Sequence, residues 1–396
     1  MPRPNVADVR ILHTSDWHLG RSFHRVDMLV HQAAFVDHLV DVVRTDAVDA
    51  VVVSGDVYDR ALPSVDTVAL LDDAIARLRD AGAVVLLTSG NHDSAVRLGF
   101  ASRVLEQAGV HVRTRLADLA RPVLLHDEHG SVLLYGLPYL EPVLAADDLA
   151  CAQRNHVSVL SAAMDRVRHD LAQRPTGTRS LVAAHAFVVG GQVSDSERDI
   201  SVGGVGSVPA EVFSGVDYVA LGHLHGRQRI SETVRYSGSP LPYSFSEHRH
   251  TKGSWLVDLD ASGVRGIEAI AAPVPRPLAL LRGRLDDLLR DPAHAPAERA
   301  WCQVTLTDPV RPREAMVRLR ERFPHALVLS FEPDVGEARD DGYAARVRGQ
   351  SAIDVCCGFL EHVRGGAGAD AAERDLMAAA LEGARLSSME RAGSAA

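Results

Sequence analysis

The chain has 396 residues, a formal net charge of −10 and an apolar fraction of 46%. That length suits two or more domains of about 100–200 residues each. No apolar run approaches the ~20 residues of a membrane helix, and the first residues lack a signal-peptide pattern, so we expect a cytoplasmic protein without a membrane segment. The negative charge argues against a grip on nucleic acid by the whole surface, but not against DNA held locally through bound cations.

The four cysteines, at positions 151, 302, 356 and 357, form no Cys-x-x-Cys pair. Buried free thiols are therefore expected, and a zinc ribbon or a disulfide framework is not. The glycine-rich stretch 190–206 lacks the Gly-Lys-Ser/Thr of a phosphate-binding loop, as does the rest of the chain. This argues against ATP hydrolysis by P-loop chemistry.

Residues 9–108 alternate between short apolar runs and amphipathic stretches. The first predicted helix has four apolar residues on one face: Val36, Leu39, Val40 and Val43. The next helix spans residues 66–81 and ends near Gly82, a suitable C-cap. Strands that alternate with such helices indicate βαβ units and a largely parallel sheet.

The remainder of the first 272 residues predicts a second sheet. Residues 124–139 form two short strands about a turn, and residues 155–173 form a helix. Residues 235–270 predict strands with tight turns, which close the second sheet against the first.

Alternating prolines between residues 272 and 277 predict a stiff connector and a domain boundary. Strands at 278–284, 301–306 and 326–331, with helices at 285–290 and 312–322, then predict a small α+β domain. Amphipathic helices at 351–363 and 371–384 finish the chain, and their apolar stripes suit either core packing or a partner surface. The predicted domains are 1–272, 278–335 and 349–390.

Polar residues follow five of the apolar runs. The segments are Asp16-Trp17-His18, Gly55-Asp56-Val57-Tyr58-Asp59, Gly90-Asn91-His92-Asp93, His185 and Gly222-His223-Leu224-His225. Each residue taken singly could be a hydrogen-bonded cap on a strand. Together they predict a ligand site, because open α/β sheets bind ligands at the carboxyl ends of their strands. Carboxylate, imidazole and amide groups suit Mn²⁺, Fe²⁺ or Zn²⁺, whereas Mg²⁺ prefers oxygen ligands with retained waters.

Seven candidate ligands are too many for one ion, so we predict two ions, about 3.5–4 Å apart. Asp56 is the candidate bridge because it follows a tight turn at Gly55 in the middle of the sheet. The first ion is assigned to Asp16, His18 and His225 with Asp56, and the second to Asn91, His185 and His223 with Asp56. Because Asp16 and His18 share one ion at i, i+2 spacing, their turn must bend.

His92 is left without a metal in this assignment. Its imidazole could protonate a leaving alkoxide, which is worth roughly 10²–10⁴-fold in rate. Asp59 is placed to accept a hydrogen bond from His92 and to orient it. The alternatives are that His92 is a third metal ligand or a structural turn residue, and that Asp59 is a turn carboxylate.

These five segments, in this order, resemble the motifs of the calcineurin-like metallophosphoesterases. Residues 11–20, 195–203 and 236–246 further resemble the SbcD family, the nuclease subunits of bacterial SbcCD complexes. The likeness extends from about residue 9 to about residue 335, and more faintly through residues 351–363.

The resemblance implies an α/β fold: a four-layer metallophosphoesterase-type sandwich of two mixed β-sheets flanked by helices, followed by a small α+β capping domain and C-terminal helices. It implies a homodimeric DNA exonuclease and single-strand or hairpin endonuclease of DNA repair and recombination. The C-terminal helices would dock on an SbcC-type ATPase. Two divalent cations are implied, with Mn²⁺ expected and Mg²⁺, Fe²⁺ or Zn²⁺ as alternatives.

One position departs from part of this family. Some relatives carry a second histidine where this chain has Asp59, so phosphate positioning by that histidine does not carry over. Asp59 instead resembles the orienting aspartate of phosphatases in the same superfamily.

Two rival functions fit parts of the sequence. A stand-alone metallophosphoesterase acting on a small phosphoester or cyclic nucleotide would use the same seven ligands but would not need the residues after 273. An inactive, metal-bound scaffold for an ATPase would be expected to lack ligands, and none is missing. The dimer surface stays open, with the helix at 28–44 as one candidate.

Overall fold

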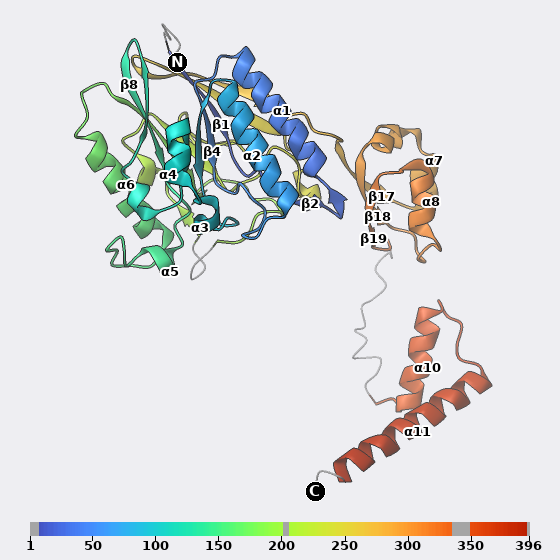
Figure 1. The fold of residues 1–396 in the computed structure, drawn as a ribbon. Coiled ribbons are helices and arrows are strands. Elements are labelled where there is room, and N and C mark those ends of the chain that lie inside the picture. Colours follow the sequence, from blue (N-terminus) through green and yellow to red (C-terminus); the bar gives the residue numbers. More distant parts are fainter. Residues whose placement is uncertain (1–7, 201–205, 335–348, 394–396) are drawn as a thin grey trace. The chain divides into compact units, whose positions relative to one another are not determined.

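The computed structural model describes residues 8–200, 206–334 and 349–393 (Figure 1). Within these ranges no helix is long and apolar enough to cross a membrane, and the four cysteines are free thiols. The chain divides into two compact units. The first comprises residues 1–280, 296–303 and 325–328, and the second comprises residues 281–295, 304–324 and 329–396. The predicted domain boundaries at 272, 278, 335 and 349 remain predictions.

The first sheet is mixed and has six strands. Its spatial order is β16 (Gly263–Ala271), β15 (Gly253–Asp260), β1 (Val9–Thr14), β4 (Ala50–Ser54), β5 (Val84–Thr88) and β6 (Val110–Arg113). Strands β1, β4, β5 and β6 run parallel, as predicted. The prediction that residues 235–270 close the second sheet is wrong for β15 and β16, because β15 pairs antiparallel with β1 and extends the first sheet. This pairing covers the edge of β1, whose main-chain groups would otherwise lack partners.

The second sheet is also mixed and has six strands. Its order is β13 (Gln228–Arg229), β14 (Val234–Tyr236), β12 (Tyr218–Gly222), β9 (Arg179–His185), β8 (Gly130–Gly136) and β7 (Val123–Asp127). The four central strands run parallel, and β13 and β7 are antiparallel edges. The predicted pair of strands in residues 124–139 is β7 and β8.

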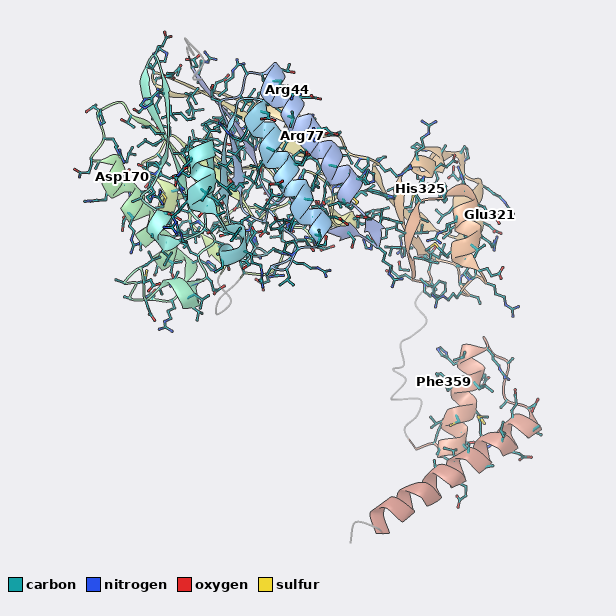
Figure 2. The ribbon with its side chains drawn as sticks, in the orientation of Figure 1. Arg44, Arg77, Asp170, Glu321, His325 and Phe359 are labelled. Carbon is teal, nitrogen blue, oxygen red and sulfur yellow. The ribbon has the colours of Figure 1, made fainter. Side chains whose placement is uncertain are left out.

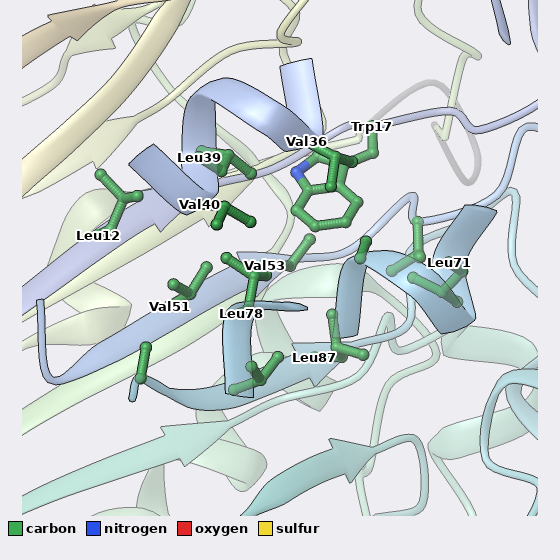
Figure 3. Packing of buried hydrophobic residues seen from close by; sticks show 14 of the residues in the cluster. Leu12, Trp17, Val36, Leu39, Val40, Val51, Val53, Leu71, Leu78 and Leu87 are labelled. Carbon is green, nitrogen blue, oxygen red and sulfur yellow. The ribbon is translucent and has the colours of Figure 1, made fainter. Parts of the chain in front are cut away.

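Two helices cover the outer face of the first sheet. They are α1 (Leu29–Thr45) and α2 (Val65–Asp80). Figure 3 shows Leu39 and Leu78 of these helices in one buried cluster with Val53 of β4. The Ser64 side chain caps α2 by accepting a hydrogen bond from the Thr67 amide. Both predicted helices are confirmed.

Two further buried clusters complete a four-layer arrangement. Ile11 of β1 and Leu181 of β9 belong to the cluster between the two sheets. On the outer face of the second sheet, α6 (His156–Leu171) packs Met164 into a cluster with Val182. The order is thus helices, sheet, sheet, helix, which confirms the predicted α/β sandwich.

Shorter elements connect these layers. They are β2 (Ser22–Phe23), β3 (Val26–Asp27), α3 (Ala95–Leu98), α4 (Ser102–Leu105), α5 (Pro142–Ala145), β10 (Phe187–Val188), β11 (Ser207–Val208) and the 3₁₀ turns η1 (Glu106–Ala108), η2 (Leu116–Asp118), η3 (Ala210–Phe213), η4 (Phe245–Glu247) and η5 (Pro292–Arg299).

A three-stranded sheet follows the proline-rich stretch. Its order is β17 (Leu278–Gly283), β18 (Trp301–Leu306) and β19 (Ala326–Phe331), with helices α7 (Leu285–Arg290) and α8 (Ala315–Arg322) between the strands. The predicted order of strands and helices is confirmed, although α8 begins at residue 315 instead of 312.

The last described elements are two helices, α10 (Ala352–Val363) and α11 (Ala371–Gly393). Salt bridges join them at Arg364 to Glu373 (2.7 Å) and at Arg374 to Asp354 (2.8 Å). No residue of α10 is buried, and Phe359, labelled in Figure 2, is 53% exposed. The predicted helices are confirmed, and α11 extends to residue 393 instead of 384.

Candidate metal centre

The predicted ligands follow five strands that end at one place in the first unit. Strands β1, β4 and β5 are parallel neighbours in the first sheet, and β9 and β12 are parallel neighbours in the second. The two sets of strand ends touch, because the Ser54 hydroxyl donates to the Ala220 carbonyl at 2.8 Å and His185 Nδ1 lies 3.0 Å from the Ser54 carbonyl. The sandwich therefore brings ligands from both sheets to one edge.

Left-handed backbone is concentrated at the predicted ligands. The φ angles of Asp16, His18, Asp56 and His223 are 52°, 44°, 48° and 108°. Residues other than glycine rarely adopt such angles, and they cluster at functional sites where the surrounding structure enforces them. The turn of Asp16 and His18 bends as the shared-ion assignment requires, and both side chains reach the same side.

Two glycines leave room for this convergence. A Cβ on Gly90 would lie 2.1 Å from Asp56 Oδ1, and a Cβ on Gly222 would lie 1.9 Å from the Ser54 carbonyl oxygen. Any side chain at either position would push strand ends apart, so the glycines of these motifs are needed for close backbone approach.

The first group of possible metal ligands comprises Asp16, His18 and His225. Their ligand atoms all lie within 4.8 Å of one another. Nε2 of His18 is 3.0 Å from Nε2 of His225, so the two rings aim at a common point. These are three of the four residues assigned to the first ion.

The second group comprises Asp16, Asp56 and His185. Asn91 Oδ1 lies 2.9 Å from His185 Nε2, which brings the predicted amide ligand to the same group. Asp56 Oδ2 lies 3.5 Å from Nε2 of His18, in the first group, and 3.5 Å from Nε2 of His185, in its own group. Asp16 is the residue that belongs to both groups.

His223 adjoins the second group through its ring and its backbone. Its ring centroid is 5.3 Å from that of His185, and its amide donates to Asp16 Oδ1 at 2.9 Å. No group of possible ligands includes its imidazole nitrogens among the described residues, so its role as a ligand remains a prediction.

The electrostatics of these residues fit a divalent cation. Burial, followed by repulsion from Asp56, raises the pKa of Asp16 well above its usual value. Burial is also the main cause that lowers the pKa values of His18, His185 and His223. Neutral imidazoles are the form that binds metal, and a cation would offset the repulsion between the two carboxylates. The described residues contain three groups that could hold a metal ion.

His92 and Asp59 lie beside the first group. His92 Nδ1 is 2.8 Å from the backbone carbonyl of Asp59, whereas the nearest carboxylate oxygen of Asp59 is 4.0 Å away. The backbone of Asp59, and not its carboxylate, therefore makes the hydrogen bond to His92. The carboxylate lies 3.6 Å from His18 Nδ1 and 3.7 Å from Arg21 Nε. With His18 and His92, Asp59 makes up the third possible ligand group.

Two further residues support the site. Asp93 belongs to one of the five predicted segments but had no role assigned from the sequence, and Ser196 lies outside those segments. Asp93 accepts hydrogen bonds from the amides of Val57, Tyr58 and Gly90 at 2.9–3.0 Å, and so ties the β4 and β5 loops together. Ser196 lies 2.6 Å from Nδ1 of His225. Its only signal in the sequence was the resemblance of residues 195–203 to the SbcD family.

Comparisons with known proteins agree with this geometry. Residues 9–227 match the model of the calcineurin-like phosphoesterase family. Residues 274–362 match a family model described as the type 5 capsule protein repressor C-terminal domain. The SbcD component of the nuclease SbcCD from Staphylococcus saprophyticus is 29% identical over 327 residues, which cover 81% of this chain and 84% of that relative.

Two solved structures are similar at low identity. A crystal structure of a Thermus thermophilus protein has a TM-score of 0.40 at 14% identity and covers 67% of this chain and 99% of that one. The anchor in the inner membrane complex of Plasmodium has a TM-score of 0.37 at 9% identity and covers 84% of this chain and 99% of that one. Neither score supports a statement about function. The family match spans more than half of the sequence, and the chain belongs to the calcineurin-like phosphoesterase family.

Proposed function

We propose that this protein is a metal-dependent DNA phosphodiesterase, the nuclease subunit of an SbcCD-type complex with an SbcC-type ATPase. It would act in the cytoplasm as an exonuclease on double-strand ends and as an endonuclease on single strands and hairpins. One observation carries the proposal: side chains of the types that bind metal, from five strand ends of two sheets, lie within a few ångström of one another. Two comparisons favour DNA as the substrate. The chain is similar to a nuclease subunit. Residues 274–362, which an enzyme for a small substrate would not need, match a second family model.

The proposed cofactor is a pair of divalent cations, with Mn²⁺ expected and Mg²⁺, Fe²⁺ or Zn²⁺ as alternatives. Asp16, His18 and His225 would hold one ion, and Asn91, His185 and His223 the other. Asp56 would bridge them, since one of its oxygens lies 3.5 Å from a ring nitrogen in each set. When bound, such ions supply a hydroxide nucleophile near neutral pH and neutralise phosphate oxygens.

His92 is the proposed general acid. The Asp59 carbonyl can only accept, so His92 Nδ1 carries a hydrogen and Nε2 is the atom left to exchange a proton with the leaving group. The His92 amide also donates to Asp56 Oδ1 at 2.9 Å, which couples the acid to the proposed bridging ligand. Asp59 would thus position His92 through its backbone.

Arginines beside the site suit a phosphodiester substrate despite the negative net charge. Arg21 and the exposed Arg60 flank the Asp59 carboxylate, and Arg198 donates to the Asn91 carbonyl at 3.3 Å. Their guanidinium groups are suited to phosphate oxygens, so DNA would be held locally and not by the whole surface.

A homodimer is part of the proposal. Exposed apolar side chains occur at Leu62, Val65, Val96, Phe100 and Val104. Arg97 Nη1 donates to the Ala61 carbonyl at 3.2 Å and so holds the first of these segments beside α3. We propose these exposed apolar side chains as the dimer surface. Phe100→Asp should shift the mass in solution from dimer to monomer, whereas Val143→Asp on α5 should not.

The test uses purified protein, Mn²⁺ and linear duplex or hairpin DNA. We expect cleavage by the wild type and a loss of roughly 10³-fold or more in Asp56→Ala, because metal stabilisation is worth several kcal/mol. Asp73→Ala, an exposed carboxylate on α2, is the matched control. Cleavage by Asp56→Ala at the wild-type rate would refute the proposal. Hydrolysis of a small aryl phosphodiester without any DNA cleavage would favour the stand-alone phosphoesterase instead.

A further inference from the structure

The ring of His225 is held from behind by a buried polar cluster. Its members are Ser196, which precedes β11, Glu247 at the end of η4, and Lys252, which precedes β15. All three are buried, as is His225 itself. We call this set the Ser196 cluster. Such groups are costly to bury unless each is fully hydrogen-bonded, so their arrangement calls for a reason.

The direction of each hydrogen bond in the cluster follows from the donors available. The Lys252 ammonium can only donate, and it bonds Glu247 Oε2, the His225 carbonyl at 2.8 Å and Ser239 Oγ at 2.9 Å. The Glu247 carboxylate can only accept, so Ser196 donates its single hydroxyl hydrogen to Glu247 Oε1 at 2.5 Å.

That assignment leaves the Ser196 oxygen as an acceptor. His225 Nδ1 lies 2.6 Å away and must therefore donate to it. Ser194 Oγ, 2.9 Å from Ser196 Oγ, is the competing partner. However, its own hydrogen goes to Glu197 Oε2 at 2.6 Å, and a carboxylate outcompetes a hydroxyl as the acceptor of the Ser196 hydrogen.

The charge of the cluster supports this direction. The Lys252 ammonium donates directly to Glu247 Oε2, so the carboxylate is paired with a buried cation. Glu247 therefore stays an acceptor. The backbone is fixed as well, because the His225 amide donates to Glu197 Oε1 at 2.7 Å.

We propose that Ser196 and Glu247 are positioning residues that hold His225 in the tautomer with a hydrogen on Nδ1, so that Nε2 presents its lone pair to the metal site. The inference rests on the proposed metal centre and deepens it. Outer hydrogen-bond partners of this kind fix the tautomer and orientation of metal-binding histidines. The proposal also assigns a function to residues 194–197, which have no role in the proposed mechanism.

Removal of the Ser196 hydroxyl should leave His225 Nδ1 without an acceptor. Glu247 Oε1 is 3.6 Å away from Nδ1, which is beyond hydrogen-bond distance. The ring could then rotate or carry its hydrogen on Nε2, where it cannot bind metal. The ion held by Asp16, His18 and His225 should lose roughly 10–100-fold in affinity, and the other ion should lose less.

The experiment is a calorimetric titration of the full chain with Mn²⁺. We expect two sites in the wild type and one weakened site in Ser196→Ala. Ser196→Thr keeps the hydroxyl and should restore wild-type binding. Ser246→Ala is the matched control, because Ser246 Oγ accepts from the Asp195 amide at 2.9 Å and anchors the same loop without a contact to His225.

A second measurement needs no loss of the hydroxyl. In the metal-free wild type, ¹⁵N NMR of the imidazoles should show His225 with its hydrogen on Nδ1, assigned by comparison with His225→Gln. A hydrogen on Nε2 would overturn the inference. So would wild-type affinity at both sites in Ser196→Ala, or equal weakening in Ser246→Ala. If the wild type bound no Mn²⁺, the proposed metal centre would be wrong as well. Failure of the metal centre can therefore be distinguished from failure of the Ser196 inference alone.

Discussion

In the metal centre, Asp16, His18 and His225 are each no more than 1% exposed, whereas no residue of α10 is buried. The candidate ligands follow strands that two sheets hold in place, and their polar atoms find hydrogen-bond partners on neighbouring loops. In the helix pair, the ion pairs Arg364–Glu373 and Arg374–Asp354 join the two helices to each other. Figure 2 shows Phe359 on this pair, and Val363 and Leu376 are also largely exposed.

This contrast separates what the protein does alone from what it does in an assembly. A site built on buried strand ends is preorganised, so it needs no partner to bring its groups together. Two short helices with exposed apolar side chains cannot bury enough surface to form a core of their own. We therefore expect substitutions in the centre to change chemistry and substitutions in the helix pair to change assembly.

The largest expected effect is on catalysis. His92→Gln should reduce DNA cleavage by roughly 10²–10⁴-fold without a change in bound metal, because glutamine cannot transfer a proton. Single-turnover cleavage and elemental analysis measure the two quantities. His126→Gln, an exposed histidine on β7, should match the wild type. Loss of metal in His92→Gln would favour the alternative that His92 is itself a ligand.

Core stability comes next. Leu39→Ala should lower the free energy of unfolding by about 2–5 kcal/mol, because the side chain is fully buried against the first sheet. Leu376→Ala should change it by about 0.5 kcal/mol or less, since that side chain is 73% exposed. Urea unfolding followed by tryptophan fluorescence is the measurement, with Trp17 in the affected cluster. If Leu39→Ala and Leu376→Ala lowered the free energy of unfolding equally, the core and the helix pair would not differ in stability as we expect.

Binding of the ATPase partner should depend on the helix pair and not on the core of the first unit. Phe359→Asp should weaken the affinity for an SbcC-type ATPase at least about 10-fold, because a buried aromatic anchor is worth more than about 1 kcal/mol. Cleavage of short DNA by the isolated chain should stay unchanged. Val317→Asp on α8, also exposed and apolar, is the control. Unaltered binding by Phe359→Asp would mean that the exposed side of α10 is not the docking surface.

The last expected effect is a pH dependence of stability. Burial lowers the pKa of His13 to about 3, against a weaker opposing effect of the hydrogen bond that the Leu221 carbonyl accepts from the His13 ring. Between pH 6.5 and 3 the unfolded chain binds a proton that the folded chain does not, so stability falls as pH falls, by at most roughly 1.4 kcal/mol per unit. In His13→Gln the urea midpoint should vary less between pH 6.5 and 4.5. The exposed His362→Gln should keep the wild-type slope, and an unchanged slope in His13→Gln would show that His13 is not the group.

Much of the architecture could be predicted because its causes are local. Apolar periodicity gives α1, α2 and α6, and proline and glycine mark the connectors. The partner of β15 could not be predicted this way. Its alternating pattern suits either sheet, and pairing with β1, about 240 residues earlier, depends on contacts that no local window contains.

By itself, the sequence determined the set of candidate ligands and their attachment to strand ends, because residue chemistry and periodicity are local properties. Only the tertiary structure decided which atom faces which. His92 bonds to the backbone carbonyl of Asp59 and not to its carboxylate. Ser196 lies within hydrogen-bond distance of His225 Nδ1 and donates to Glu247. Hydrogen bonds act over about 3 Å, so residues far apart in the chain become partners only when packing has fixed their distance.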